Sequence, residues 1–176
     1  MKLRSIEAPR PSQPAHAVGR SITHRVGVIS DTHGLVRPEA LARLRGVSLI
    51  VHAGDVGHPD VLETLETIAP VVAVRGNNDR GRWARGLQET ERVAVDGVVL
   101  FVVHDLATLA IDPVAAGVQV VIAGHSHRPS ITKRDGVTFL NPGSAGPRRF
   151  ALPIALARLD VQKGRVRARI VELIPR

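Results

Sequence analysis

The chain has 176 residues, a formal net charge of +8 at pH 7 and no cysteine. Its length suffices for one domain with a sizeable hydrophobic core. The lack of cysteine excludes disulfide frameworks, thiolate metal sites and cysteine nucleophiles, so any bound metal would be held by oxygen and nitrogen atoms.

The positive charge comes mainly from arginine, because only three of the 24 basic side chains are lysines. A GC-rich genome explains this bias without a function, and a polyanionic partner is the alternative. The basic residues are scattered along the sequence, and only one tryptophan and three phenylalanines can stack on bases. The composition therefore disfavours long nucleic acids as partners.

Residues 1–24 contain three prolines and no apolar core of the kind found in secretory signals. We expect this basic stretch to be a flexible N-terminal leader, followed by one domain at 25–176. No apolar run approaches the ~20 residues of a membrane helix, so we expect a cytoplasmic protein without a membrane partner. The sequence leaves open whether copies of the chain form a homo-oligomer.

Apolar strands alternate with amphipathic helices in the first half of the domain. We expect strands at 25–30, 48–54 and 71–76, with helices at 38–46 and from about 59 to 68 between them. This alternation predicts parallel strands joined by right-handed crossovers.

Hairpin signals dominate the second half of the domain. The Asp-Gly pairs at 96–97 and 135–136 each separate two apolar runs, which is typical of a two-residue turn. Residues 112–117 begin with Asp-Pro and end with glycine, which favours a short helix. The last two strands meet at 162–164. The whole pattern predicts an α/β fold with two mixed β-sheets packed face to face and flanked by helices, a four-layer αββα sandwich.

Five of the predicted strands end in polar side chains that can bind a metal. These are Asp31 and His33, then Asp55, then Asn77, Asn78 and Asp79, then His104, and finally His125 and His127. Open α/β sheets place their ligands at the C-terminal ends of the strands. Carboxylates and imidazoles that converge there would be costly to bury without a cation. In an extended segment residues i and i+2 point the same way, so each Asp-x-His or His-x-His pair could present two ligands to one place.

Several polar or aromatic residues have two explanations that the sequence does not separate. His52 lies within a predicted strand, where a core histidine is the simpler interpretation. Asn141 either supports a metal ligand or belongs to a plain turn. Arg148 and Arg149 could reach a substrate phosphate or face solvent, and Trp83 could overhang the site or anchor the core.

Taken together, the motifs SDTHG (30–34), GD (54–55), RGNND (75–79), His104, GHSH (124–127) and LNPGS (140–144) resemble a known family. They are similar to those of the calcineurin-like metallophosphoesterases, in the small bacterial and archaeal phosphodiesterase branch that includes YfcE-type enzymes and to which Vps29 is also similar. The resemblance runs from residue 25 to about residue 148. It implies the metallophosphoesterase fold and hydrolysis of small phosphoesters, nucleotides among them.

The resemblance also implies a centre with two divalent metal ions. Its ligands would be Asp31, His33 and His127 for one ion, Asn77, His104 and His125 for the other, and Asp55 as a bridge. Mixed oxygen and imidazole ligands suit Mn, with Fe, Ni, Co or Zn as alternatives, better than Ca or Mg.

The implied mechanism is an in-line displacement by a hydroxide that bridges the two metals. Asp55, Asn78 and His104 would be the catalytic residues. Asn78 stands where much of the superfamily has a histidine; it can hydrogen-bond a phosphoryl oxygen but cannot supply a proton at neutral pH. This departure favours esters with good leaving groups. The alternative function is a non-catalytic protein-interaction scaffold of the Vps29 kind that keeps the metal site.

Overall fold

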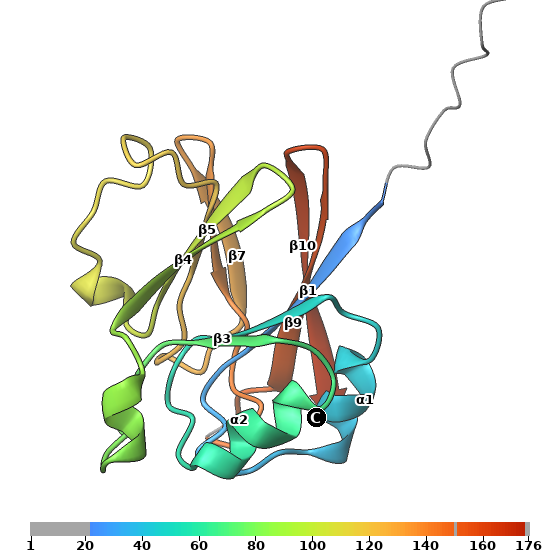
Figure 1. Ribbon diagram of the computed structural model, residues 1–176, viewed down its shortest axis with the longest axis vertical. Coiled ribbons are helices and arrows are strands. Elements are labelled where there is room, and N and C mark those ends of the chain that lie inside the picture. Colours follow the sequence, from blue (N-terminus) through green and yellow to red (C-terminus); the bar gives the residue numbers. More distant parts are fainter. Residues whose placement is uncertain (1–21, 150, 175–176) are drawn as a thin grey trace, which may run out of the picture.

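The computed structural model describes residues 22–149 and 151–174 and contains two five-stranded sheets (Figure 1). The first sheet consists, in spatial order, of β10 (Arg165–Ile174), β9 (Ile154–Gln162), β1 (His24–Ile29), β2 (Leu49–His52) and β3 (Val71–Ala73). The second consists of β4 (Thr90–Val95), β5 (Val98–Val103), β6 (Val120–Ile122), β8 (Val137–Asn141) and β7 (Ser130–Arg134). The helices are α1 (Pro38–Leu44), α2 (Pro59–Glu66) and the 3₁₀ helices η1 (Trp83–Gly86) and η2 (Leu106–Thr108).

Both sheets are mixed, which confirms the predicted fold class. Strands β1, β2 and β3 are parallel, while β9 and β10 are antiparallel additions. In the second sheet β5, β6 and β8 are parallel, and β4 and β7 flank them in antiparallel hairpins. Residues 1–21 of the expected leader lie outside the described part of the chain, and its last residue, His24, begins β1. Neither α-helix in the described ranges is long and apolar enough to cross a membrane.

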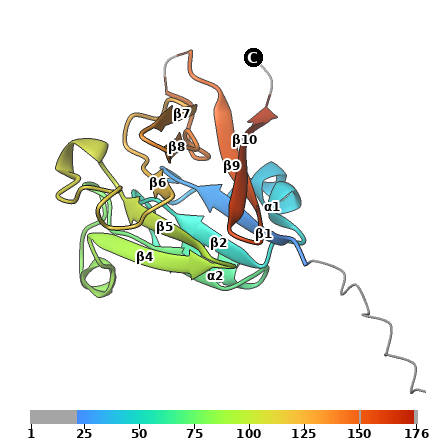
Figure 2. The ribbon, with the colours of Figure 1, turned by 90° about the horizontal axis from the view of Figure 1, so that it is seen from above.

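The main hydrophobic core lies between the two sheets. It contains fully buried side chains from both, among them Val28, Val51, Leu100, Ile122 and Leu159. A second cluster packs the two α-helices on the outer face of the first sheet, where α1 lies next to β10 (Figure 2). The burial of these apolar side chains is the main force that holds the strand ends in place.

The outer face of the second sheet is covered differently from what the sequence predicts. The helix expected at 112–117 is a turn, although Asp112 caps it as predicted: its Oδ1 accepts from the backbone N–H of Val114 at 2.9 Å and of Ala115 at 3.3 Å. A positive φ at Gly117 ends the segment, leaving too few residues to nucleate a helix. A loop with the single 3₁₀ turn η2 therefore lies over this sheet.

Arginines that are scattered in the sequence gather on the outer face of the first sheet. They are Arg25 from β1, Arg158 from β9, and Arg165, Arg167 and Arg169 from β10. Desolvation, followed by the charges of Arg169 and Arg25, lowers the pKa of the Arg158 guanidinium. Asp160 lies among them, 3.7 Å from Arg169. The like charges repel one another, so this face opposes folding at low ionic strength.

We expect added salt to stabilise the protein by screening this face. Raising NaCl from about 20 mM to about 500 mM should raise the thermal midpoint, and Arg165→Gln should shrink that rise by about 2 °C. Differential scanning calorimetry of both proteins measures it. Equal salt responses would show that the arginines do not destabilise the fold.

His52 of β2 is a core residue, as its position in a strand predicts. It is fully buried, with Nε2 2.9 Å from Thr32 Oγ1. The Thr32 hydroxyl donates to the Val56 carbonyl, so Nε2–H of His52 is the donor and Nδ1 is a lone pair without a hydrogen-bond partner. Burial lowers the pKa of His52 from 6.5 to about 4, because the charged imidazole would lose its hydration.

This lowered pKa predicts a loss of stability on acidification. The unfolded chain binds the proton more tightly than the native chain, so stability is complete above pH 6.5 and falls toward pH 4. The His52 contribution to the free energy of unfolding should drop by about 2 kcal/mol between about pH 7.5 and pH 5. Urea unfolding of the wild type and His52→Gln at both pH values isolates this term, and identical pH dependences would contradict it.

Candidate metal centre

The structure brings all seven candidate ligands together where strands of the two sheets end. Asp31 and His33 follow β1, Asp55 follows β2, Asn77 follows β3, His104 follows β5, and His125 and His127 follow β6. Each has an oxygen or nitrogen within 3.9 Å of one belonging to another member. The convergence of parallel strand ends therefore places groups from distant segments in one cluster.

Asp31, His33 and His127 form one part of this cluster. One ligand atom of each lies within 4.8 Å of the other two. His127 Nε2 is 3.2 Å from Asp31 Oδ1 and 3.4 Å from His33 Nε2, and the two imidazoles are stacked. Asp31 Oδ1 is buried, and the described residues provide no hydrogen-bond partner for it. A cation bound to these three atoms would satisfy the buried oxygen.

Asn77, His104 and His125 form the other part. Asn77 Oδ1 lies 3.0 Å from both His104 Nε2 and His125 Nδ1. His104 Nδ1 is 2.8 Å from the Ala53 carbonyl, which can only accept. The proton of a neutral His104 is therefore on Nδ1, and the lone pair on Nε2 faces an oxygen acceptor. Such an arrangement is stable only with a proton or a cation between the two atoms.

Asp55 lies between the two parts. Its Oδ2 is 3.9 Å from His33 Nε2 and 3.5 Å from His104 Nε2. Asn78 donates to it twice, from the backbone N–H to Oδ1 at 2.7 Å and from the side-chain amide to Oδ2 at 2.6 Å. The amide of Asn78 is thus directed at Asp55, whereas the sequence led us to expect it to contact a phosphoryl oxygen.

The electrostatics of the centre favour positive charge at its middle. Burial alone would raise the pKa of Asp55, but hydrogen bonds from His104 and Asn78 outweigh burial and hold that pKa below its ordinary value. Burial would lower the pKa of His104, but its hydrogen bonds with Asp55 and Ala53 outweigh burial and raise it. For His33 burial prevails and lowers the pKa. Asp55 is an anion here, and His104 attracts a proton where a metal could bind.

The backbone at five of the seven candidate ligands is left-handed, which differs from the extended conformation that the spacing suggested. Positive φ angles occur at Asp31 (53°), His33 (47°), Asp55 (53°), His125 (64°) and His127 (57°). Such residues cost about 1–3 kcal/mol each and are concentrated at functional sites. Asp31 and His33 still reach the same part of the cluster. His125 and His127, in contrast, turn into different parts.

Close backbone approach around the centre requires glycine at several positions, of which Gly54 and Gly76 lie nearest His104 and Asp55. A Cβ at Gly54, where φ is +88°, would overlap the His104 ring, and a Cβ at Gly76 would overlap Asp55. Both glycines immediately precede candidate ligands in the sequence. They allow the strand ends to crowd around Asp55.

The sequence did not assign a specific role to two supporting residues. Asp79 accepts from the backbone N–H of Gly57 and of Gly76, both at 2.8 Å, and so ties the loop after β2 to the loop after β3. Its place beside two asparagines was a signal, but the sequence did not specify its role. Ser30 donates to Asp31 Oδ2 at 2.7 Å. A serine at a strand end is too common to have been recognised.

For most of the residues that had two possible roles, the structure shows which role applies. Asn141 Nδ2 donates to the Gly124 carbonyl at 2.6 Å and to Ser126 Oγ at 3.0 Å, so it supports the loop that carries His125. Trp83 packs against the core cluster outside the first sheet. Arg148 and Arg149 are exposed, and the charge of Arg149 contributes to the lowered pKa of His33.

Comparison with known proteins agrees with this geometry. The calcineurin-like phosphoesterase superfamily domain matches residues 25–164. A probable metallophosphoesterase of Methanothermobacter thermautotrophicus is 36% identical over 151 residues, which are 78% of this chain and 87% of that protein. The structure of an archaeal phosphodiesterase has a TM-score of 0.69 and 25% identity, covering 84% of this chain and 99% of that one. Vps29 of Entamoeba histolytica in complex with Zn²⁺ has a TM-score of 0.64 and 25% identity, covering 85% and 99%.

The family match spans most of the described domain and includes all seven candidate ligands. The relatives extend over nearly the same length as this chain, so the likeness concerns the whole fold. The phosphoesterase activities for which these relatives are named agree with a centre rich in oxygen and imidazole ligands. The chain therefore belongs to the calcineurin-like phosphoesterase superfamily and is a phosphoric ester hydrolase.

Proposed function

We propose that the protein is a metal-dependent phosphodiesterase that hydrolyses small phosphoesters at a dinuclear centre. The observation that carries this proposal is the position of Asp55 Oδ2 between two sets of ligand atoms, 3.9 Å from His33 and 3.5 Å from His104. The neighbouring archaeal protein is named a phosphodiesterase, which supports the choice of diester.

The ligand assignment follows the two parts of the cluster. Asp31, His33 and His127 would hold one divalent ion, Asn77, His104 and His125 the other, and Asp55 would contact both. We expect Mn²⁺, with Fe, Ni, Co or Zn as alternatives. When bound, such a pair activates water as the nucleophile and stabilises the attacking and leaving oxygens of an in-line displacement.

The side chains of this protein position the centre. The Ala53 carbonyl fixes the tautomer of His104, so that its Nε2 lone pair faces inward. Asn78 orients Asp55 through two hydrogen bonds. Asn78 cannot supply a proton at neutral pH, so we expect the leaving oxygen to take its proton from water.

A scaffold role is the second candidate, because several of the structural neighbours are Vps29 proteins. Those neighbours are similar to this chain in fold at 25% identity. The set of seven candidate ligands favours catalysis over this alternative, since a scaffold does not require an open centre.

Metal removal gives the main test. Protein stripped with chelator should be inactive, and Mn²⁺ should restore hydrolysis of an aryl phosphodiester in preference to the matching monoester. Asp55→Asn and His104→Ala should each lower the rate by at least about a hundredfold, since even outer-shell partners of a metal matter by 10–100-fold. Asp135→Asn, a matched change in a hairpin turn at positive φ, should retain the activity. Metal-independent rates that are equal in all four proteins would favour the scaffold.

Replacement of Asn78 separates its two roles. If Asn78 acts by orienting Asp55, Asn78→Ala should weaken Mn²⁺ binding by about tenfold, and excess Mn²⁺ should restore kcat. Titration of activity against Mn²⁺, together with calorimetric metal binding, measures this. A kcat that stays low at saturating metal, with unchanged metal affinity, would instead assign Asn78 to the phosphoryl group.

A further inference from the structure

We propose that the pocket beside His125 binds the nucleobase of the substrate, so that the substrate is a phosphodiester with a nucleoside as one of its ester groups. This inference rests on the proposed phosphodiesterase function, because it places the phosphate at the candidate metal centre. It adds a binding site for the organic part of the substrate that uses none of the expected catalytic residues.

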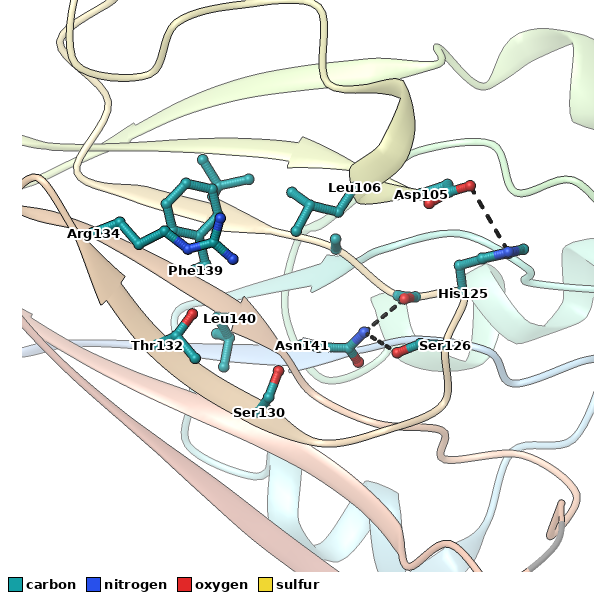
Figure 3. A pocket seen from close by; sticks show the side chains of 13 residues that line it. Asp105, Leu106, His125, Ser126, Ser130, Thr132, Arg134, Phe139, Leu140 and Asn141 are labelled. Carbon is teal, nitrogen blue, oxygen red and sulfur yellow. Dashed lines mark hydrogen bonds and ion pairs between the residues drawn. The ribbon is translucent and has the colours of Figure 1, made fainter.

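The pocket lies on the outer face of the second sheet and has a volume of about 270 Å³. Figure 3 shows Asp105 and His125 at one end and Arg134 and Phe139 at the other. Its apolar floor comes from β6 and β8, and η2 contributes Leu106 above it. A pocket below the ~300 Å³ of drug-sized sites accommodates one ring system with its sugar but not a polymer.

The pocket exists because no helix within residues 22–149 and 151–174 covers this part of the sheet. The predicted helix at 112–117 is a turn, and the loop that holds η2 leaves the floor accessible. Leu106 in that loop is 38% exposed. An exposed apolar side chain over an apolar floor indicates a surface that a ligand can cover.

The far end of the pocket favours a flat, polar-edged group. The Arg134 guanidinium lies 5.1 Å from the centroid of the Phe139 ring, and planar bases stack on guanidinium and aromatic planes. Along β7, Ser130 and Thr132 line the pocket with Arg134. Their hydroxyls can donate and accept, as the edge of a nucleobase requires. An aliphatic ester group would leave these polar groups unused.

The near end joins the pocket to the metal centre. His125 lines the pocket and has Nδ1 3.0 Å from Asn77 Oδ1. Asp105 lies beside it, with Oδ2 3.8 Å from His125 Nε2. The carboxylate of Asp105 can accept a hydrogen bond from a sugar hydroxyl. Phosphate at the centre, sugar at Asp105 and base at Arg134 and Phe139 match the order of groups in a nucleotide.

Binding of two monophosphates tests the pocket without relying on turnover. We expect the full chain to bind adenosine 5′-monophosphate about tenfold more tightly than ribose 5-phosphate, in keeping with the value of one base stack. The ratio should persist in Mn²⁺ and in chelator, because the pocket contributes no proposed metal ligand except His125. Calorimetry, and NMR titration for weak binding, measure both affinities.

Three variants locate the effect. Arg134→Ala and Phe139→Leu should reduce the affinity ratio to about twofold or less. Leucine keeps the apolar packing that Phe139 makes with the cluster on the outer face of the second sheet, which contains Val121 and Val137. Lys133→Ala removes the same charge from the alternate face of β7 and should preserve the ratio. Thermal midpoints identify any variant that fails to fold, in which case the other variant decides.

Two phosphodiester substrates distinguish the absence of a base site from the absence of phosphodiesterase activity. Hydrolysis of a methyl p-nitrophenyl phosphodiester tests the centre alone, and the matching nucleoside diester tests the centre with the pocket. The variants should raise KM for the nucleoside ester only. Equal affinities of the wild type for the two monophosphates, with metal-dependent hydrolysis intact, would overturn the base site and leave the function standing. Absence of hydrolysis for both esters would overturn the function.

Discussion

The central constraint on this structure is that hydrogen-bond acceptor atoms of several side chains meet around Asp55 and repel one another. Asp31 Oδ1 is buried without a hydrogen-bond partner, and His104 Nε2 faces two oxygens because its other nitrogen is held by a carbonyl. Neutral side chains cannot satisfy these contacts with one another. A proton on His104 removes part of this repulsion, because the protonated imidazole can donate to the oxygen of Asp55, and the pKa of His104 is raised for that reason. Divalent cations would remove all of it, and metal binding would then be linked to the stability of the centre.

This crowding is maintained by the rest of the fold. Five of the candidate ligands have left-handed backbone that is unfavourable for non-glycine residues. The buried core between the sheets fixes the strand ends, and Asp79 joins two of the loops through paired backbone hydrogen bonds. Glycines at 54 and 76 remove the side chains that would keep the strands apart. The burial of apolar surface elsewhere thus offsets a strained and polar centre.

The two outer faces of the sandwich are covered by different elements. Helices α1 and α2 cover one end of the first sheet, while arginines occupy the rest of that face. In the described part of the chain, the apolar outer surface of the second sheet is covered by a loop and a 3₁₀ turn beside the candidate centre. A thinner covering next to the reactive groups is what gives the pocket its access to His125.

The sequence by itself predicted the strands, the two packed sheets and the polar strand ends, because apolar periodicity and strand-end polarity are local patterns. The set of seven candidate ligands came from the resemblance of its motifs to a family and stays a prediction. It was wrong about the helix at 112–117, where the cap was present but the segment was too short. Only the tertiary structure decided that the backbone at His125 and His127 is left-handed, that Asn78 is directed at Asp55 and that Asp79 ties two loops. It also gathered arginines from three strands on one face. These properties depend on backbone conformation and contacts between distant segments, which strand spacing does not encode.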